Sequence, residues 1–212
     1  MFYALYDVPM KQNINRFEGG KNMEITRQNE LIGALDELKK ETQEMQRKGL
    51  PFMMASVVVW SLILYIQIKV QDLNKVNLYA FIASCYMMPA AMVFGKFLKA
   101  PFLKKSKNPI NKLGFLCTMN QNLYILIVMW ACSIHPSAMI MIYAMVFGAH
   151  LLPFAWVHDN KAYMAASILE TVGAMLIATK FGNIPMIMFI IVMQVTLSVI
   201  LFVDTRKVKN LN

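Results

Sequence analysis

The sequence has few charged residues for its length, and this shortage decides its class. Aspartate, glutamate, lysine and arginine make up 16% of the 212 residues, whereas hydrophobic residues make up 58% and the mean hydropathy is +0.47. An ordinary soluble domain carries about 25% charged residues, which it needs to cover its surface. The composition therefore excludes a soluble globular protein and favours an integral membrane protein.

Cysteine and catalytic motifs are also scarce. The three cysteines, Cys85, Cys117 and Cys132, fall in apolar runs, with neither a C-x-x-C pair nor metal-ligand spacing. The chain has no G-x-S-x-G or H-E-x-x-H motif, no glycine-rich phosphate loop and no paired acidic motif of an intramembrane protease. We therefore expect inert thiols, no metal ion and no cofactor.

The basic residues outnumber the acidic ones, 21 to 12, which gives a net charge of +9. They are divided among the connections between apolar runs rather than gathered in a stripe with exposed aromatic residues. We therefore expect no nucleic-acid partner. Such a distribution is typical of membrane topology and of contact with anionic lipid headgroups.

Six apolar runs are long enough to cross a bilayer as helices, which takes about 20 residues each. The fifth run is the weakest, because Glu170 lies at its centre among small residues that allow membrane helices to approach closely. We predict an all-α membrane bundle of six transmembrane helices over residues 49–205, with the fifth run packed inside it. The runs cover residues 50–69, 77–98, 113–133, 137–157, 161–179 and 184–203.

Lysine and arginine are distributed unequally over the two sides of this bundle. Counted from Lys39 onward, the alternating set of connections that includes the N-terminal segment holds 14 of them, and the other set holds three. Because basic connections stay in the cytoplasm, both termini, including the tail at 206–212, are predicted to be cytoplasmic. The lysines between the second and third runs would contact anionic headgroups, unless they only determine the topology. The lysines expected at the headgroups are Lys96, Lys99, Lys104, Lys105 and Lys107.

The first 48 residues divide at Met23. Residues 1–22 have neither a signal-peptide core nor a helical period, and the codons of Glu18-Gly19-Gly20-Lys21 would form a purine-rich ribosome-binding sequence ahead of Met23. We interpret residues 1–22 as a leader artefact before the natural start, or as a disordered tail, and infer a bacterial source. Residues 23–48 have a loose apolar stripe between charged residues, which predicts an amphipathic cytoplasmic helix.

The fourth run contains Gly148-Ala149-His150 followed by Pro153, so a titratable ring lies beside a helix-breaking residue. Pro153 has no N–H group, and the carbonyl of Ala149 therefore loses its helical donor where the helix bends. In a membrane this carbonyl needs a donor from a neighbouring helix, a hydroxyl or water. An ionisable residue at this place is a candidate functional residue. The alternative is a kinked helix whose histidine only fastens the bundle.

Four of the predicted helices carry their most polar residues at a similar depth. At about 1.5 Å per residue, these residues lie roughly 10 to 14 Å from the cytoplasmic ends. One interpretation is a polar cavity open to the cytoplasm, with proton-carrying or cation-binding groups; the alternative is a dry hydrogen-bonded layer that fixes helix register. The layer comprises Asn120, Gln121, Asn122, His150, Glu170 and Gln194, with Tyr143 on the helical face of His150 and Tyr163 on that of Glu170.

Glu170 and His150 lie at matched depth on consecutive antiparallel helices, so we predict that the two side chains interact. A carboxylate at this depth is costly unless a neighbouring imidazolium keeps it charged. Replacing Glu170 with Gln would then preserve the fold and abolish proton- or cation-dependent behaviour.

Four short elements resemble a known family. They are Lys48-Gly49-Leu50-Pro51-Phe52, Asn108-Pro109 ahead of Leu113-Gly114, Gly148-Ala149-His150 with Pro153 and Trp156, and Val203-Asp204. Together they are similar to a family of small bacterial multi-pass membrane proteins that is known only as a domain of unknown function, over about residues 45–207. The resemblance implies a helical fold in the bacterial cytoplasmic membrane and supplies no activity.

Three functions are compatible with these patterns. A small transport-like or ligand- or ion-binding bundle with a polar layer open to the cytoplasm fits them best. The second is a structural or immunity-type partner of another membrane protein, or a homo-oligomer. The third is a membrane-embedded lipid-modifying enzyme, for which no nucleophile is evident, since Ser137 lies at the wrong end of its helix and Ser167 is small and common.

Overall fold

The computed structural model describes residues 10–102, 104 and 106–209, and within these residues the chain forms helices and no strand. The chain divides into two compact units, residues 1–38 and residues 39–212. Of the leader inferred at residues 1–22, the first nine lie outside the described residues, and α1 (Met10–Gln46) begins at Met10.

The helix predicted over residues 23–48 is present as part of α1, and it ends two residues earlier than expected. Residues 23–34 are exposed, including Ile25, Leu31 and Ile32. A short 3-10 helix, η1 (Arg47–Gly49), follows, and the left-handed backbone of Gly49, with φ at +77°, turns the chain into the next helix. Glycine has no Cβ and adopts this conformation without strain.

Six helical stretches are long and apolar enough to cross a membrane, as the six runs predict. Their bounds lie within a few residues of the predicted ones at most ends. They are α2 (Leu50–Lys69); α3 (Leu73–Cys85) with α4 (Met87–Phe97); α5 (Pro109–Ile134); η2 (Pro136–Ala138) with α6 (Met139–Ala149) and α7 (Leu152–Val157); α8 (Lys161–Phe181); and α9 (Asn183–Lys209).

Three of these helices begin at side chains that cap free backbone N–H groups. Asp72 accepts hydrogen bonds from the amides of two residues at the start of α3, Asn108 from Ile110 in α5, and Asn160 from Ala162 in α8. Asp and Asn are favoured at this position because their oxygens replace the missing helical acceptors. The polar connections of the sequence therefore set where the apolar helices begin.

The second run differs from its prediction as one helix over residues 77–98. It forms α3 and α4, which meet at Tyr86. Pro89 lies in the first turn of α4, where its missing N–H group is tolerated, and it could not continue the hydrogen-bond ladder of α3. The predicted run of residues 77–98 includes Pro89 without a break.

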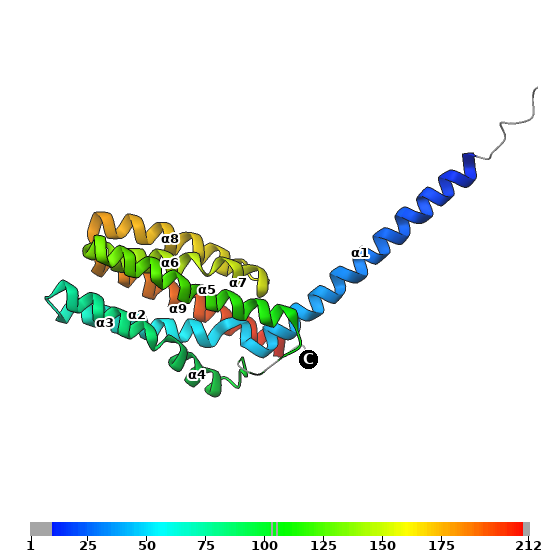
Figure 1. The fold of residues 1–212 in the computed structure, drawn as a ribbon. Coiled ribbons are helices and arrows are strands. Elements are labelled where there is room, and N and C mark those ends of the chain that lie inside the picture. Colours follow the sequence, from blue (N-terminus) through cyan, green and yellow to red (C-terminus); the bar gives the residue numbers. More distant parts are fainter. Residues whose placement is uncertain (1–9, 103, 105, 210–212) are drawn as a thin grey trace, which may run out of the picture. The chain divides into compact units, whose positions relative to one another are not determined.

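Helix α2 is the central helix of the bundle. It packs against α9 on one side and against α3 and α4 on the other, while α8 packs against α9 and α6 (Figure 1). Trp60 of α2 is fully buried, and its ring lies 5.3 Å from that of Tyr143 and 5.6 Å from that of Phe147 on α6. These contacts form the main hydrophobic core.

The prediction that the fifth run lies inside the bundle is wrong. In an 18-residue apolar segment of α8, 28% of the residues are buried. In the corresponding segment of the stretch that includes α2, 50% are buried. Ala166, Ser167 and Ala174 are buried in α8, which packs against α6 and α9, whereas Met164, Ile168 and Leu169 are exposed. Small residues therefore mark a close helix contact on one face, and the other face carries the large apolar side chains.

Candidate ligand cavity and buried polar triad

The fourth span is broken between α6 and α7, at His150 and Leu151. Pro153 is the second residue of α7, and the Ala149 carbonyl, which Pro153 leaves without a helical donor, lies 3.5 Å from the Ser167 hydroxyl of α8. A hydroxyl of a neighbouring helix thus supplies the donor. His150 lies at this break, between α6 and α7. The Nδ1 atom of its ring forms a hydrogen bond with the carbonyl of Phe147.

Gly148 lets α6 and α8 approach each other closely. A Cβ atom at this position would lie 2.9 Å from the Cβ of Glu170 and 2.9 Å from both the amide nitrogen and the hydroxyl of Thr171. The Thr171 hydroxyl is also 3.4 Å from the carbonyl of Met145. Only glycine fits at this crossing, and it brings the backbone of α6 against the carboxyl-bearing turn of α8.

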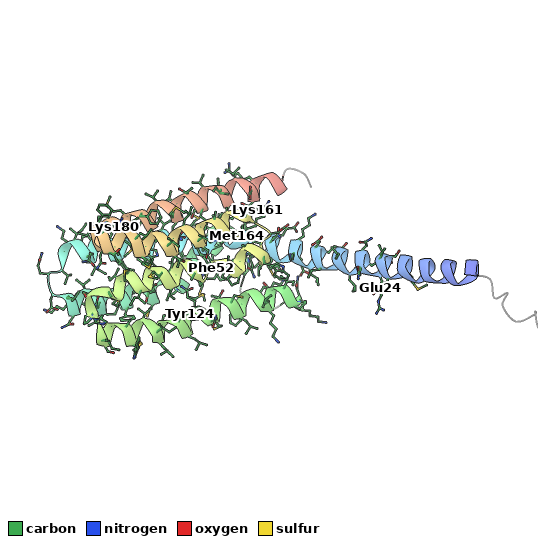
Figure 2. All side chains as sticks on the ribbon, turned by 90° about the horizontal axis from the view of Figure 1, so that it is seen from above. Glu24, Phe52, Tyr124, Lys161, Met164 and Lys180 are labelled. Carbon is green, nitrogen blue, oxygen red and sulfur yellow. The ribbon has the colours of Figure 1, made fainter. Side chains whose placement is uncertain are left out.

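Glu170 belongs to a buried triad that joins three helices. Gln194 of α9 donates from its Nε2 to both carboxyl oxygens of Glu170, at 2.8 and 2.9 Å. The Ser56 hydroxyl of α2 lies 2.7 Å from Oε1 of Gln194. All three side chains are 0% exposed. Glu170 lies about midway along α8, whose ends are marked by Lys161 and Lys180 (Figure 2).

The structure divides the polar layer expected from the sequence. Glu170 and Gln194 are joined, whereas no hydrogen bond or ion pair connects Glu170 with His150 among the described residues. Asn120 is exposed on α5, donates to the hydroxyl of Tyr124 at 2.7 Å, and lines a smaller pocket together with His150. The side chain of Asn122 lies outside the described residues. Gln121, His150 and Tyr163 of the predicted layer line a cavity at the lysine-rich end of the bundle.

A cavity of about 480 Å³ lies at the lysine-rich end of the bundle. Aromatic rings and methionines form the apolar part of its wall, amides and hydroxyls form the polar part, and two exposed lysines lie at its rim. No carboxylate lines it among the described residues. Its lining residues include Phe52, Met53, Lys104, Lys112, Phe115, Thr118, Gln121, His150, Phe154, His158 and Tyr163.

A row of four rings runs along one face of α6 and α7 and ends at His158, just after the span; all of them except Phe147 line the cavity. The rings of Phe147, His150, Phe154 and His158 follow one another with centroids 5.3 to 5.9 Å apart. Their spacing of three or four residues places them on one helical face. His158 was not among the predicted site residues, although its spacing of four from Phe154 and eight from His150 places it on the same helical face.

His158 is a buried polar side chain in the cavity wall. It is 1% exposed, and neither ring nitrogen has a hydrogen-bond partner among the described residues. Burial and, secondarily, the charge of Lys48 lower the pKa of His158 to about 3. The ring is therefore neutral near pH 7 and presents one donor and one acceptor without partners.

The base of the cavity is held by contacts between η1, α8 and α9. The Tyr163 hydroxyl donates to the Lys48 carbonyl at 2.7 Å, beside Gly49. The Lys48 ammonium lies 3.8 Å from Asp204, which also accepts a hydrogen bond from Asn160 at 2.9 Å. These polar contacts fix the turn before α2 and thereby one wall of the cavity.

The last residues of α1 and the connection before α5 close the cavity on another side. Lys39 lies over the ring of Trp156, 4.1 Å from its centroid. Glu41 accepts a hydrogen bond from Asn108 at 3.0 Å, and Gln46 donates to Asn111. The ring of Phe102 packs on Phe52, with centroids 4.8 Å apart. The residues between 39 and 46 thus belong to the bundle.

Comparison with protein families identifies the chain. A family model described as a family of unknown function, DUF7010, matches residues 35–204. The chain belongs to this family. No curated protein and no solved structure matches it.

The DUF7010 match contains both candidate sites, since every residue of the triad and of the cavity wall lies between residues 35 and 204. Among the described residues, no three His, Cys, Asp or Glu side chains lie close enough together to hold a metal ion. Tyr143, which was expected in the polar layer, packs instead in the core beside Trp60.

Proposed function

We propose that this member of DUF7010 is a multi-pass protein of the bacterial cytoplasmic membrane that binds a small amphipathic anion in the cavity at its cytoplasmic end. The observation that carries the proposal is the cavity itself. Ligand sites are typically concave, mostly apolar, and provided with a few convergent polar groups. A cavity of about 480 Å³ with aromatic walls, two histidines and two lysines has this character.

The charge distribution supports cytoplasmic access to this cavity. Lys96 is exposed in the last turn of α4, and Lys99, Lys104 and Lys107 are exposed in the connection between α4 and α5; Lys104 also lines the cavity. Lysine-rich connections remain in the cytoplasm during membrane insertion. The same exposed lysines would attract anionic headgroups, each by about 1 kcal/mol. Lys105, the fifth lysine expected at the headgroups, lies outside the described residues.

The lining favours an anion over the cation expected from the sequence. Lys104 and Lys112 supply positive charge at the rim, and the described wall contains no carboxylate to hold a cation. Amides and hydroxyls such as Gln121 and Tyr163 can bond a polar head, while Phe52 and Phe115 suit an apolar chain. A carboxylate or phosphate headgroup on a short hydrocarbon chain combines both features.

Thermal unfolding of the purified protein in neutral detergent tests this proposal. Amphiphiles with one chain length and an anionic, zwitterionic or cationic head would be compared at equal concentration. We expect stabilisation by the anionic member, because a ligand that binds only the folded state raises its stability in proportion to occupancy. Equal effects of all three heads would contradict binding in this cavity.

A pair of threonine variants locates the effect. Thr118→Phe fills part of the cavity and should abolish the stabilisation. Thr196→Phe is the matched control, because Thr196 is exposed on α9 and, like Thr118, bonds the carbonyl four residues before it. Loss of stabilisation in both variants would place the ligand elsewhere.

A second candidate function, a contact with another membrane protein or another copy of the chain, is favoured by α5. In its 18-residue apolar segment only 12% of the residues are buried, which is the smallest share among the six spans. The exposed Asn120 is an amide in the middle of this span, where a partner helix could hydrogen-bond it. Asn120→Leu should then dissociate an oligomer or a co-purifying partner, as measured by size-exclusion chromatography with light scattering.

A further inference from the structure

Glu170 is a buried acid without a counter-ion. It is 0% exposed, and no lysine, arginine or histidine forms an ion pair with it among the described residues. Its hydrogen bonds come from one amide group, that of Gln194. An uncompensated charge inside a membrane segment is costly, so such a residue calls for a functional explanation.

In the described part of the chain, the titratable groups on the helices packed against this region form no hydrogen bond or ion pair with Glu170. On α2 they are Tyr65, which is exposed, and Lys69 at the helix end; on α9 the first is Asp204, which pairs with Lys48. His150 bonds Phe147, Tyr143 packs on Trp60, and Tyr163 donates to Lys48. The remaining groups of α8, Lys161 and Lys180, lie at its two ends.

The serine of the triad has two acceptors for one proton. The Ser56 hydroxyl oxygen lies 2.7 Å from the Met53 carbonyl and also 2.7 Å from Oε1 of Gln194. A hydroxyl has a single hydrogen and can also accept. The two short distances therefore correspond to two different hydrogen-bond arrangements of the same heavy atoms.

In the first arrangement Glu170 is ionised. Ser56 donates to the Gln194 carbonyl oxygen, and the Gln194 NH₂ group donates to the carboxylate. In the second, a proton from the aqueous phase has added to a carboxylate oxygen and the Gln194 amide has turned by 180°. The carboxyl O–H then donates to the amide oxygen, the amide NH₂ donates to Ser56, and Ser56 donates to Met53. The two ends of an amide have nearly the same shape, so the turn needs no extra space.

We propose that Glu170 is a proton-binding site in which Gln194 and Ser56 satisfy both the neutral and the ionised carboxyl group. Buried polar groups without partners are strongly destabilising, and this triad provides partners in either state. Met53 connects the site with the cavity, because its carbonyl accepts from Ser56 and its side chain lines the cavity wall. The proton site does not depend on the identity of the cavity ligand.

Infrared difference spectroscopy of the purified protein across a pH series tests the proposal. A neutral carboxyl group has a C=O band that a carboxylate lacks. We expect one such band to vanish as the pH rises, to be missing in Glu170→Gln at every pH, and to change at the same midpoint as an amide band that is missing in Gln194→Leu. Glu170→Gln should fold, because its amide reproduces the donor of the neutral carboxyl group.

The variant Gln194→Leu separates a proton site from a structural fastener. It removes the donors of the ionised form, and hydrogen bonds to a charged group are stronger than those to a neutral one. The midpoint of the carboxyl band should therefore move to higher pH, by about one unit or more. Gln67→Leu is the control, because Gln67 is an amide on α2 whose carbonyl oxygen has no partner among the described residues. It should leave the midpoint unchanged.

Three results would overturn the proposal. One is the absence of any carboxyl band that depends on Glu170 while the protein remains folded. Another is a band that persists at every pH, which would mean a permanently neutral acid. The third is an equal midpoint in Gln194→Leu and in the unchanged protein.

Discussion

His158 is a buried residue that also lines the cavity. Its ring is buried among Phe154, Tyr163 and the backbone of Gly49. The positive charge of Lys48 adds to the effect of burial in lowering the pKa of the ring. Such a position favours the neutral imidazole. The side chain can therefore exchange hydrogen bonds with a ligand without carrying a charge into the bundle.

The first prediction concerns the pH dependence of stability. The folded pKa of His158, about 3, lies below the ordinary value of 6.5, so the unfolded chain binds the proton more readily. Its contribution to stability is thus present above about pH 6.5 and is lost as the pH falls toward 3, by about 1.4 kcal/mol for each unit of pKa difference. Melting temperatures in detergent between pH 7 and pH 4 should fall less steeply for His158→Phe than for the unchanged protein.

His135→Phe is the matched control for this measurement. His135 is exposed at the start of η2, so its replacement should leave the acid sensitivity as it was. An identical pH profile for His158→Phe and the unchanged protein would contradict the burial of a neutral ring.

Glycine positions decide how closely the helices approach. At Gly148 a Cβ would meet both Glu170 and backbone of α8, whereas at Gly114 the nearest atom, from Gln46, is 3.6 Å away. The close crossing of α6 and α8 therefore rests on one missing methyl group. It also positions the carboxyl-bearing turn of α8 against α9.

The second prediction is that Gly148→Ala destabilises the bundle by about 1 to 3 kcal/mol, because the methyl group forces α6 and α8 apart. Gly114→Ala should have little effect, since its methyl group meets only ordinary contacts. Melting temperatures in the same detergent compare the two. Equal losses would mean that the crossing tolerates a side chain.

The third prediction concerns the partner of Glu170. A double-mutant cycle with Glu170→Leu and Gln194→Leu should give a coupling of about 0.6 to 1.7 kcal/mol, the range for hydrogen bonds between membrane helices. The cycle of Glu170→Leu with His150→Leu should be additive to about 0.5 kcal/mol, because the two share no hydrogen bond. Strong coupling to His150 would instead support the pair inferred from the sequence.

At the scale of the whole molecule, composition and apolar runs were sufficient to predict the helical class and the six long apolar helices. Depth counting grouped Glu170 with Gln194, because both residues lie near the middle of neighbouring helices. It could not show which way each side chain turns. In the structure Asn120 is exposed, and His150 lines the cavity instead of contacting Glu170.

The cavity itself could not be predicted from the sequence, because its wall joins residues from six α-helices, the short helix η1 and three connections. The break at Pro153 was recognisable from the missing N–H group, whereas Pro89 was overlooked inside a longer apolar run. His158 was overlooked because it follows the end of the run and carries no motif. Long-range packing, rather than local pattern, brings Phe52, Phe115 and His158 together.

The fourth prediction is the topology of the chain. With both termini in the cytoplasm, reporter fusions after Lys75, near Cys132 and at Lys180 should report the outside. Fusions at Asp159 and Lys209 should report the inside. If α8 failed to insert because of Glu170, the Lys180 and Lys209 fusions would both reverse, and the membrane bundle would have five spans.

Access of an impermeant thiol reagent to the cavity tests the central claim most directly. Thr118→Cys would be made in a variant without Cys85, Cys117 and Cys132, with Thr196→Cys as the control on an exposed apolar face. A cavity open to the cytoplasm predicts labelling of Thr118→Cys in inside-out vesicles, protection by the anionic amphiphile, and no labelling in intact cells. Thr196→Cys should stay unlabelled in both. Labelling of Thr118→Cys from the outside, or its absence from both sides, would contradict the account.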